Sequence, residues 1–565
     1  MNTGTLPETI HVPVEVPAGY WRRESTHGPR PISPFFRGGL ALVTQTFGSA
    51  FSQLGALVET IEFREIGGWV YTRMVPPGGV EDRPPSPELL RERTERALET
   101  VRSDRFADYI DQWPQWRSEH IAGVARLREV DLASLDDDGL AAHLGEIFEF
   151  SVGAWNLHFL LHSIGALMLA DLAFACRDLL GWDDAQALTL LAGLSKASSE
   201  PADVLAGLAA MAADRPEVRR FIETGETDVA RLSDIDPEFA ERFCAYQEEF
   251  GFRSIRYEVA EPSVLETPSI TLRLIADQLR SGYDPSVRAA EVASRREAAR
   301  AEARELLGDR PDADRARFER ALERAHRWYP AREDYAPMTF SEQLALIRRV
   351  ALEIGRRLAE SSLIDDPDDV FFLEGDEAGA ALAGRTDGTA ADCRDLVRRR
   401  RAERAWAEAH PGPESYGEPR PVPGLDELPP EAAFVTHALL WLFERSGHYA
   451  PTPRPQPAGC RIAGIPAAGG TYTGPARVLM GEADFGKLQP GDVLVCPITS
   501  PVWSVLFPNV GALVTDAGCV LSHSAIIARE FRIPAVVATG NATALLRDGQ
   551  YVTVDGATGS VEVAG

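Results

Sequence analysis

Hydrophobic and polar residues alternate in one short stretch near the start of the chain, and this stretch predicts a β-hairpin. From Ile61 to Met74 the side chains alternate around the pair Gly67-Gly68, as expected for two strands joined by a primed two-residue turn. Further on, Ser86 is suited to cap a helix that has Pro87 at its first position, because proline is favoured there. The pattern therefore predicts a hairpin followed by a helix.

Helical periodicity then dominates to about Leu442. The segment Val287 to Trp328, rich in Ala, Arg and Glu, is typical of a solvated helical hairpin, and Gly308 to Pro311 interrupts it. The most apolar helix is predicted from His158 to Trp182. Because polar and charged residues interrupt its apolar run, we expect a buried core helix and not a membrane span. The interrupting residues are His162, Asp171, Arg177 and Asp178.

The last hundred residues have a different pattern, in which short apolar runs are bounded by Gly and Pro. Such runs are typical of β-strands, and a short helix is predicted between two of them, so this region is predicted to be a compact α/β module. The runs are Gly491 to Pro497, Gly511 to Asp516, Ile533 to Thr539 and Tyr551 to Val563.

The fold class that follows is multidomain, with a mainly α-helical domain followed by a small α/β domain of β/β/α type. The change from helical to strand pattern adjoins the Pro-rich segment Tyr449 to Ala458, which is predicted to be a semi-rigid linker with a hinge at Gly459. The predicted segments are an N-terminal part with the hairpin at residues 1–86, the helical domain at 87–447, the linker at 448–460 and the α/β domain at 461–565.

Composition restricts the partners and the compartment. The formal net charge of -27 disfavours nucleic acid and anionic membranes, which bind basic surfaces. The six cysteines are scattered singly, and no signal peptide is visible at the start, so a reducing cytoplasm is expected. The two lysines, Lys196 and Lys487, lie outside any GxxxxGK[ST] loop, which excludes a P-loop nucleotide site.

One histidine stands at the start of the helix predicted in the α/β module. In TDAGCVLSHSAIIARE, Thr515 to Glu530, a β-type run is followed by a loop, then Ser522 as N-cap and a helix from His523 to Glu530. The start of a helix presents unpaired N–H groups and the positive end of the helix dipole. An anion on the His523 imidazole, such as a phosphoryl group, would therefore be stabilised there.

This motif and its surroundings resemble the swivelling phosphohistidine domain of the PEP-utilising enzymes. The resemblance rests on GIPAAGGTYTGPARVL, LQPGDVLVCPITSP, TDAGCVLSHSAIIAREFRIPAVVATGNAT and DGQYVTVDGATGSV, in this order. It implies that His523 carries a phosphoryl group between two sites, with Gly518, Cys519, Ser522 and Arg529 as supporting motif residues. Cys519 replaces a second glycine of many relatives, and Leu521 replaces the regulatory threonine of the dikinase.

The helical region is similar to the substrate-binding domain of the rifampicin phosphotransferases and prodigiosin-condensing synthetases. The segments that carry this similarity are GYWRRESTHGPRPISPF, FGFRSIRYEVAEPSVLETPS and GRRLAESSLIDDPDDVFFLEGDE. Within them, Arg253, Arg256 and Glu258 either line a substrate cleft or pair with one another. Where relatives have GHRG this chain has Gly251 to Ser254, so a role for that histidine does not carry over.

Other candidates have structural interpretations beside the functional ones. His158 and His162 lie four residues apart on one helical face, which suits core or pocket histidines as well as a metal; no metal site is predicted. Cys519 is a nucleophile candidate or a thiol that fills a loop. The acidic run Asp365 to Asp369 is predicted to be a solvated turn before a strand at Val370 to Leu373.

Two enzymatic functions remain open at this point. Relatives begin with an ATP-grasp domain that is not visible here, so in the first a separate ATP-binding subunit phosphorylates His523, which then activates a small molecule of the natural-product class. In the second, ATP chemistry has been lost and His523 is the general acid or base of a lyase, dehydratase, cyclase or condensing enzyme. A non-catalytic scaffold is the third hypothesis. No cofactor is expected on this chain alone, and ATP and Mg are expected only through the partner.

Overall fold

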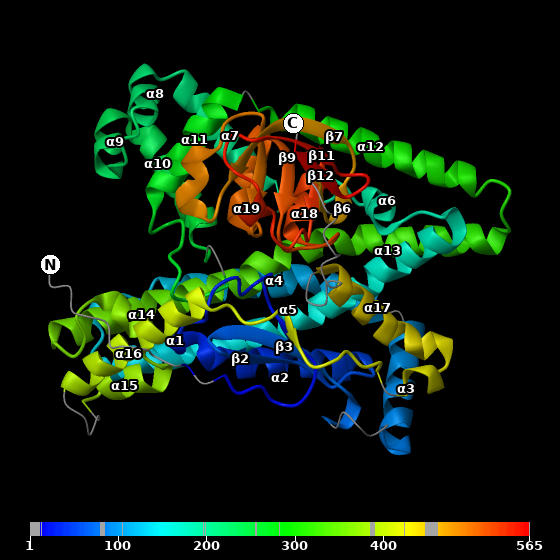
Figure 1. Ribbon diagram of the computed structural model, residues 1–565, viewed down its shortest axis with the longest axis horizontal. Coiled ribbons are helices and arrows are strands. Elements are labelled where there is room, and N and C mark those ends of the chain that lie inside the picture. Colours follow the sequence, from blue (N-terminus) through cyan, green and yellow to red (C-terminus); the bar gives the residue numbers. More distant parts are fainter. Residues whose placement is uncertain are drawn as a thin grey trace. The chain divides into compact units, whose positions relative to one another are not determined.

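The structure, a computed structural model, divides into two compact units (Figure 1). The first unit comprises residues 1–163, 256–262 and 335–437, and the second comprises 164–255, 263–334 and 438–565. The domain boundaries predicted above are drawn differently and stay a prediction. The residues that the structure describes are 12, 14–79, 85–103, 105–195, 197, 199–254, 257–281, 283–384, 390–422, 424–446 and 461–563. The predicted linker and its hinge at Gly459 lie outside them.

The first unit contains an antiparallel sheet of four strands in the order β2-β3-β1-β4. The predicted hairpin is confirmed: Ile66 pairs with Trp69 across Gly67 and Gly68, whose φ angles of 61° and 89° fit a primed turn. The short β1 and β4 were not predicted. The strands are β1 (Trp21–Arg23), β2 (Thr60–Ile66), β3 (Trp69–Val75) and β4 (Ser415–Tyr416).

Helices make up most of the first unit. The predicted start of α3 is confirmed, because the Ser86 hydroxyl accepts a hydrogen bond of 3.2 Å from the Leu89 N–H and Pro87 is the first helical residue. The helices are α1 (Pro34–Arg37), α2 (Gly39–Leu54), η1 (Pro77–Gly79), α3 (Pro87–Arg102), α4 (Arg105–Arg128), η2 (Leu132–Ser134), η4 (Pro337–Ser341), α14 (Glu342–Glu360), η5 (Pro367–Phe372), α15 (Gly375–Leu382), α16 (Ala390–Ala409) and η6 (Leu425–Glu427). It also includes parts of α5 (Asp137–Leu180) and α17 (Pro430–Ser446).

The predicted strand at Val370 to Leu373 is wrong, because Val370 to Phe372 belong to the short 3₁₀ helix η5 and Leu373 follows as its C-cap. The Asp366 carboxylate accepts from the Asp368 N–H, and the Asp369 carboxylate accepts from the Asp366 N–H at 3.1 Å. This reciprocal capping satisfies the amide groups of a helical turn. Asp369 is also buried and paired with Arg401, so the acidic run is not simply solvated.

The second unit combines helices with the whole C-terminal α/β module. The predicted helical hairpin is confirmed as α12 and α13, which are separated at Leu307 to Pro311. The helices are α6 (Asp184–Thr189), α7 (Glu200–Ala213), α8 (Pro216–Glu223), α9 (Val229–Ile235), α10 (Pro237–Tyr246), η3 (Gln247–Gly251), α11 (Pro268–Ser281), α12 (Pro285–Leu306), α13 (Asp312–Ala336), η7 (Glu482–Lys487), η8 (Pro501–Asn509), α18 (His523–Glu530) and α19 (Ala542–Leu545). The remaining parts of α5 and α17 also belong here.

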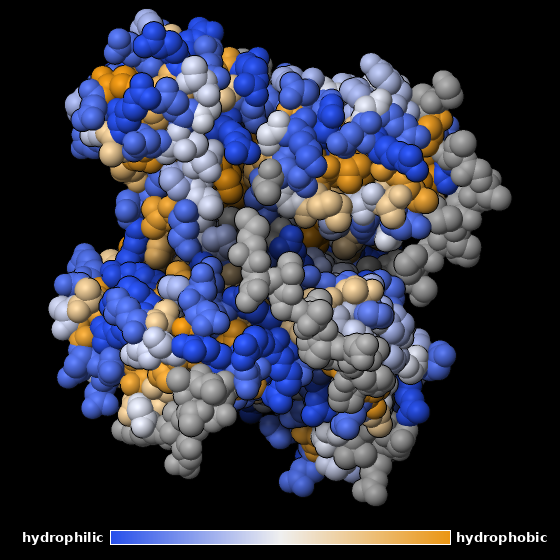
Figure 2. Space-filling model, turned by 60° about the vertical axis from the view of Figure 1, so that its left-hand side comes forward, coloured by the Kyte–Doolittle hydropathy of each residue, from blue (hydrophilic) through white to orange (hydrophobic). Residues whose placement is uncertain are grey.

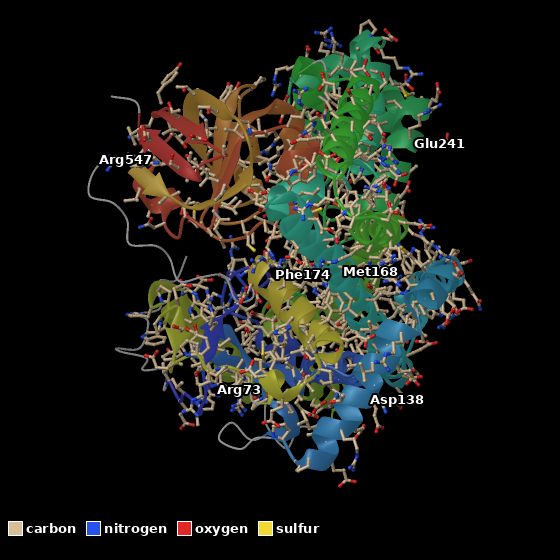
Figure 3. All side chains as sticks on the ribbon, turned by 90° about the vertical axis from the view of Figure 1, so that its right-hand side faces the viewer. Arg73, Asp138, Met168, Phe174, Glu241 and Arg547 are labelled. Atoms are coloured by element: carbon tan, nitrogen blue, oxygen red, sulfur yellow. The ribbon has the colours of Figure 1, made fainter. Side chains whose placement is uncertain are left out.

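Helix α5 is long and apolar enough to cross a membrane by length and composition, and among the described residues it is the single helix of this kind. However, 78% of its most apolar window is buried inside the protein. In the second unit, Phe174 of α5, labelled in Figure 3, lies edge-to-face with Trp441 of α17. These contacts are those of a core helix, as predicted.

The α/β module is built on an eight-stranded sheet in the order β5-β12-β11-β7-β8-β9-β10-β6. The four strands from β7 to β10 run parallel to their neighbours in this order, and the flanking pairs are antiparallel. The predicted mainly helical region followed by an α/β domain is therefore confirmed. The strands are β5 (Arg461–Ala463), β6 (Ile465–Ala468), β7 (Thr471–Val478), β8 (Asp492–Cys496), β9 (Val510–Thr515), β10 (Ala535–Val537), β11 (Tyr551–Asp555) and β12 (Ser560–Val563).

Strand β8 shows why this region reads as continuous apolar runs. Val493 and Val495 face one apolar cluster, whereas Leu494 and Cys496 face another. A strand that is buried on both faces needs apolar side chains at every position. The cluster around Leu494 also contains residues of α7, α10 and α11, so within the second unit the sheet packs on these helices.

The surface of the protein is mainly hydrophilic on the face that Figure 2 shows. Hydrophilic side chains cover much of the face shown in Figure 2, and hydrophobic ones form small scattered groups. A net charge of -27 keeps such a surface repulsive toward polyanions.

Candidate functional site

His523 lies at the carboxyl edge of the parallel strands in the second unit. Strands β8 and β9 end at Cys496 and Thr515, and the segments that follow them bring Ser500 and His523 together. Ligand sites of α/β sheets usually occur at this edge, because the chain leaves each strand there in a loop. The topology thus places the histidine of the motif where a site is expected.

The loop before His523 is held in a fixed conformation. Gly518 has φ 115°, and a Cβ at this position would lie 3.0 Å from the Ser522 hydroxyl oxygen, so glycine is required. The Leu521 N–H donates to the Arg445 carbonyl at 2.9 Å, and the Cys519 thiol donates to the Glu444 carbonyl at 3.3 Å. Both acceptors belong to the end of α17. Cys519 is buried, and this contact gives it a structural role in the loop.

The predicted capping role of Ser522 is only partly right. Ser522 does occupy the N-cap position, but its hydroxyl donates to the Cys519 carbonyl at 2.7 Å instead of accepting from the helix. No side chain caps α18, so its first N–H groups stay available for an anion.

The electrostatic setting of His523 favours the neutral imidazole. Burial lowers its pKa to about 4, and a backbone hydrogen bond with Ser500 opposes this shift only in part. The residue is half-buried as a whole, yet its Nε2 atom is fully buried and has no hydrogen-bond partner among the described residues. A buried polar nitrogen without a partner is uncommon in folded proteins and requires an explanation.

The other end of α18 is fastened to the sheet and to the helices of the same unit. The Arg529 guanidinium donates to the Ala467 carbonyl at 3.0 Å, and the Arg529 carbonyl accepts from Arg295 at 2.9 Å. The Glu530 carboxylate is buried, accepts from the Gly193 N–H at 2.8 Å and lies 3.7 Å from Arg288. Arg529 is therefore a positioning residue for the helix that carries His523.

His158 and His162 are brought together in the first unit, but as a stacked pair. Their ring centroids are 6.2 Å apart, His158 Nδ1 lies 3.0 Å from the Thr339 hydroxyl and His162 Nδ1 lies 3.2 Å from the Tyr335 hydroxyl. Burial, aided by the charge of His27, lowers the pKa of His158 to about 3. Within the described ranges no group of three His, Cys, Asp or Glu residues is suited to a metal ion.

Arg253, Arg256 and Glu258, which the resemblance to the substrate-binding domain singled out, do not form one cluster among the described residues. Glu258, in the first unit, is buried and accepts from the Ser33 N–H at 2.8 Å and from the Ser33 hydroxyl at 2.6 Å. Burial raises its pKa despite these hydrogen bonds. Arg253, in the second unit, lies over the Phe250 ring at 5.6 Å. Arg256 lies outside the described residues, so the predicted cleft role of this trio stays a prediction.

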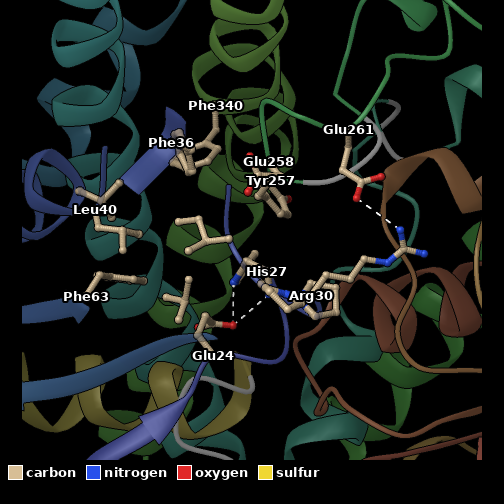
Figure 4. Close-up of a pocket in the computed structure, with 16 residues that line it drawn as sticks. Glu24, His27, Arg30, Phe36, Leu40, Phe63, Tyr257, Glu258, Glu261 and Phe340 are labelled. Atoms are coloured by element: carbon tan, nitrogen blue, oxygen red, sulfur yellow. Dashed lines mark hydrogen bonds and ion pairs between the residues drawn. The ribbon is translucent and has the colours of Figure 1, made fainter. Parts of the chain in front are cut away.

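A pocket in the first unit is the second candidate site of this protein (Figure 4). Its empty space of about 630 Å³ includes open solvent, so the pocket is a partly open hollow in the surface of this unit. Phe36, Leu40, Phe63 and other apolar side chains form its walls. Its polar residues are Glu24, His27, Arg30, Tyr257, Glu258 and Glu261.

Sequence reasoning missed five of these six polar residues, although all five lie in the segments that carry the family resemblance. Glu24 and His27 belong to GYWRRESTHGPRPISPF, three residues apart. The Glu24 carboxylate is buried, accepts from the His27 N–H at 2.9 Å and lies 3.3 Å from His27 Nδ1. The spacing Glu-x-x-His was the available signal, but it identifies a pair only once the chain is known to turn there.

Two family models match parts of the chain. Residues 488–559, which include His523, match the mobile domain of PEP-utilising enzymes, and residues 158–333 match the fourth domain of rifampicin phosphotransferase. The predicted resemblance is thereby confirmed. The chain is a relative of the PEP-utilising enzymes that combines these two domains.

Individual relatives extend the similarity along the chain. It is 26% identical to the uncharacterized phosphotransferase YvkC of Bacillus subtilis over 96% of its own length and 62% of the relative. It is 30% identical to a rifampicin phosphotransferase of a Streptomyces species over 68% of its own length and 42% of the relative. It is 28% identical to chondramide synthase cmdD of Chondromyces crocatus over 89% of its own length and 13% of the relative. The chain thus spans less than two thirds of each of these relatives.

Proposed function

We propose that this chain is a phosphotransfer enzyme or enzyme subunit in which His523 accepts a phosphoryl group and passes it to a small molecule. The observation that carries the proposal is the buried Nε2 of His523, which has no hydrogen-bond partner among the described residues, at the uncapped start of α18. An added phosphoryl group would use the ring nitrogen and the helix amides together. The proposal thus explains two otherwise unsatisfied features of one site.

The protonation state supports a nucleophile. With a pKa lowered to about 4, the imidazole is neutral at neutral pH and keeps a lone pair for attack on phosphorus. The same value makes the imidazolium scarce, which weakens a general-acid role for His523. The lowered pKa therefore weakens only the general-acid form of the alternative, and the support for the carrier comes from the unpaired Nε2 at the uncapped start of α18.

The names of the relatives support phosphoryl transfer and suggest the class of acceptor. Two of the relatives are called phosphotransferases, and the third is a chondramide synthase. Phosphorylation of a natural product of intermediate size is consistent with both kinds of name. We also propose that a separate ATP-binding partner supplies the phosphoryl group to His523.

The proposal is tested by labelling the full chain with potassium phosphoramidate, a small phosphoryl donor to imidazoles. Peptide mass spectrometry at alkaline pH should find about 80 extra mass units on the peptide that contains His523, the mass of one phosphoryl group. ATP alone should leave the chain unlabelled. A His410→Ala control, which changes an exposed histidine stacked on Trp406, should keep the label on His523.

Two outcomes would count against the carrier. Label that stays on this peptide in the His523→Ala variant would mean that another residue accepts the phosphoryl group. Turnover of a substrate by the chain without any phosphoryl donor would instead indicate the acid-base enzyme.

A further inference from the structure

We infer that the Ser500 hydroxyl binds the phosphoryl group that His523 carries, by donating a hydrogen bond to one of its oxygens. The inference rests on the proposed function, because it needs a phosphoryl group on His523. It adds a second residue to the phosphoryl site and assigns a function to the segment between β8 and η8.

Two neighbouring contacts place Ser500 beside His523. The backbone of Ser500 forms a hydrogen bond with the His523 ring. One residue away on each segment, the hydroxyls of Thr499 and Ser524 share a buried hydrogen bond of 2.8 Å. Because consecutive residues of one segment meet consecutive residues of the other, Ser500 stays next to the imidazole as long as both contacts are formed.

The Ser500 hydroxyl is an unused hydrogen-bond donor. Its oxygen is buried and has no hydrogen-bond partner among the described residues. Ser500 occupies the N-cap position of η8, where a serine hydroxyl usually accepts from a helix amide, yet its side chain makes no such bond. A buried hydroxyl without a partner is unfavourable, so its presence beside His523 indicates a partner that binds there.

Neighbouring hydroxyl groups at the same edge of the sheet are already bonded. The hydroxyls of Thr515 and Ser522 donate to backbone carbonyls at 2.6 Å and 2.7 Å. The Thr539 hydroxyl donates to the Thr515 carbonyl at 2.9 Å. Ser500 differs from these neighbours because its hydroxyl forms no bond within the described part of the chain, and it is therefore the donor suited to an added anion.

The surroundings of Ser500 and His523 favour negative charge. Helix η8 begins directly after Ser500 and α18 begins at His523, and no side chain caps either helix. The start of a helix carries partial positive charge. A phosphoryl group on the imidazole is an anion, and hydrogen bonds to charged oxygens are stronger than those between neutral groups. The unused hydroxyl would therefore gain a strong acceptor when His523 is phosphorylated.

Ser500 would act on the charge of the phosphoryl group and not on its bonds. With phosphoramidate as donor, the lone pair of the imidazole forms the bond to phosphorus. The phosphorus–nitrogen bond of phosphoramidate breaks, and ammonia leaves with its electron pair. Ser500 keeps its own proton throughout, and its hydrogen bond stabilises the phosphoryl oxygens during the transfer and afterwards.

The test compares phosphoryl uptake by variants of the full chain. Each is incubated with potassium phosphoramidate, and the label on His523 is followed with time by mass spectrometry at alkaline pH. Ser500→Ala should take up label about 10- to 100-fold more slowly than wild type, as expected when a hydrogen bond to a charged group is lost. Ser500→Thr keeps a hydroxyl and should restore most of this rate.

Two further variants are matched controls. Ser286→Ala removes an exposed hydroxyl at the start of α12 in the same unit and should take up label at the wild-type rate. Thr499→Val removes the neighbouring contact with Ser524 and leaves the Ser500 hydroxyl in place. It should therefore slow uptake less than Ser500→Ala does.

The stability of the unlabelled chain separates a binding role from a structural one. Because the Ser500 hydroxyl has no partner there, unlabelled Ser500→Ala should unfold at the same temperature as wild type or at a higher one. A hydroxyl that held the fold together would give the opposite result. After removal of phosphoramidate, Ser500→Ala should also lose its phosphoryl group faster than wild type.

Several outcomes would contradict the role of Ser500. Uptake by Ser500→Ala at the wild-type rate would overturn the inference. A slow rate that Ser500→Thr does not restore, or a lower unfolding temperature of unlabelled Ser500→Ala, would overturn it as well. Absence of label on His523 in the wild-type chain would instead overturn the proposed function, and this inference with it.

Discussion

Two histidines of this protein are neutral for the same reason but are bonded differently. His158 of α5 and His523 of α18 both have a pKa lowered mainly by burial, to about 3 and about 4. His158 is hydrogen-bonded to Thr339 and surrounded by Phe159, Tyr335 and Phe340. His523 has a buried Nε2 without a partner among the described residues. Burial alone therefore does not identify a reactive histidine, and an unpaired buried nitrogen alone does not either, because the buried Nε2 of His143 also has no hydrogen-bond partner among the described residues. At His523 the unpaired nitrogen coincides with the uncapped start of α18.

The comparison predicts different losses of stability when each ring is removed. His158→Ala deletes a hydrogen bond and several ring contacts, so the free energy of unfolding of the first unit should fall by roughly 2–4 kcal/mol. His523→Ala should cost less than about 1 kcal/mol in the second unit, because it also removes an unsatisfied polar atom. Urea unfolding with hydrogen exchange read separately in each unit measures both. Equal losses would break the distinction.

Acid should destabilise both regions. Each folded-state pKa lies below the unfolded value of about 6.5, so below that pH the unfolded chain binds protons that the folded chain does not. Stability is therefore lost as the pH falls, by on the order of 2 kcal/mol for each histidine between about pH 7 and about pH 5. Replacing either histidine by Gln should remove the part of this pH-dependent loss of stability that the histidine causes. A pH dependence that survives both replacements in full would contradict this assignment.

Replacement of the buried carboxylate of Glu530, at the end of α18, should reduce stability less than the loss of the His158 ring. Glu530→Gln keeps an acceptor for the Gly193 N–H but removes the charge opposite Arg288, at a cost of about 1–2 kcal/mol. Hydrogen exchange should increase in the peptides that contain Gly193 and α18 and stay unchanged in the first unit. Equal exchange in wild type and variant would show that this contact does not fasten the helix.

The smallest effect is expected at Cys519. Cys519→Ala loses a weak thiol hydrogen bond to the Glu444 carbonyl, so stability should fall by less than about 1 kcal/mol. Phosphoryl uptake at His523 should be unchanged. A large loss of uptake with normal folding would reopen the nucleophile interpretation of this thiol.

Much of the fold could be predicted because its signals are local. The hairpin at Gly67-Gly68, the start of α3 at Ser86 and the bounds of α18 each depend on a few neighbouring residues. The strand predicted at Val370 failed because Asp366 and Asp369 cap a helical turn there, which outweighs the β propensity of an apolar run. Strands β1 and β4 are too short for any pattern.

The site could be predicted only in part. His523 was found because a single motif contains it. The Glu24–His27 pair, in contrast, depends on a turn that brings the carboxylate back to the imidazole, and the pocket around it combines residues near positions 30, 65, 260 and 340. Contacts between residues that are far apart in the chain produce no periodic pattern in a single sequence.

The central claim is that His523, and not a structurally bonded histidine, accepts the phosphoryl group. Phosphorus NMR of the phosphoramidate-labelled chain tests it most directly, with wild type, His523→Ala and His158→Ala treated in parallel. We expect the phosphorus–nitrogen signal assigned to the carrier to be present in wild type and His158→Ala and absent from His523→Ala. A signal that persists in His523→Ala, or that is lost from a folded His158→Ala chain alone, would contradict the account.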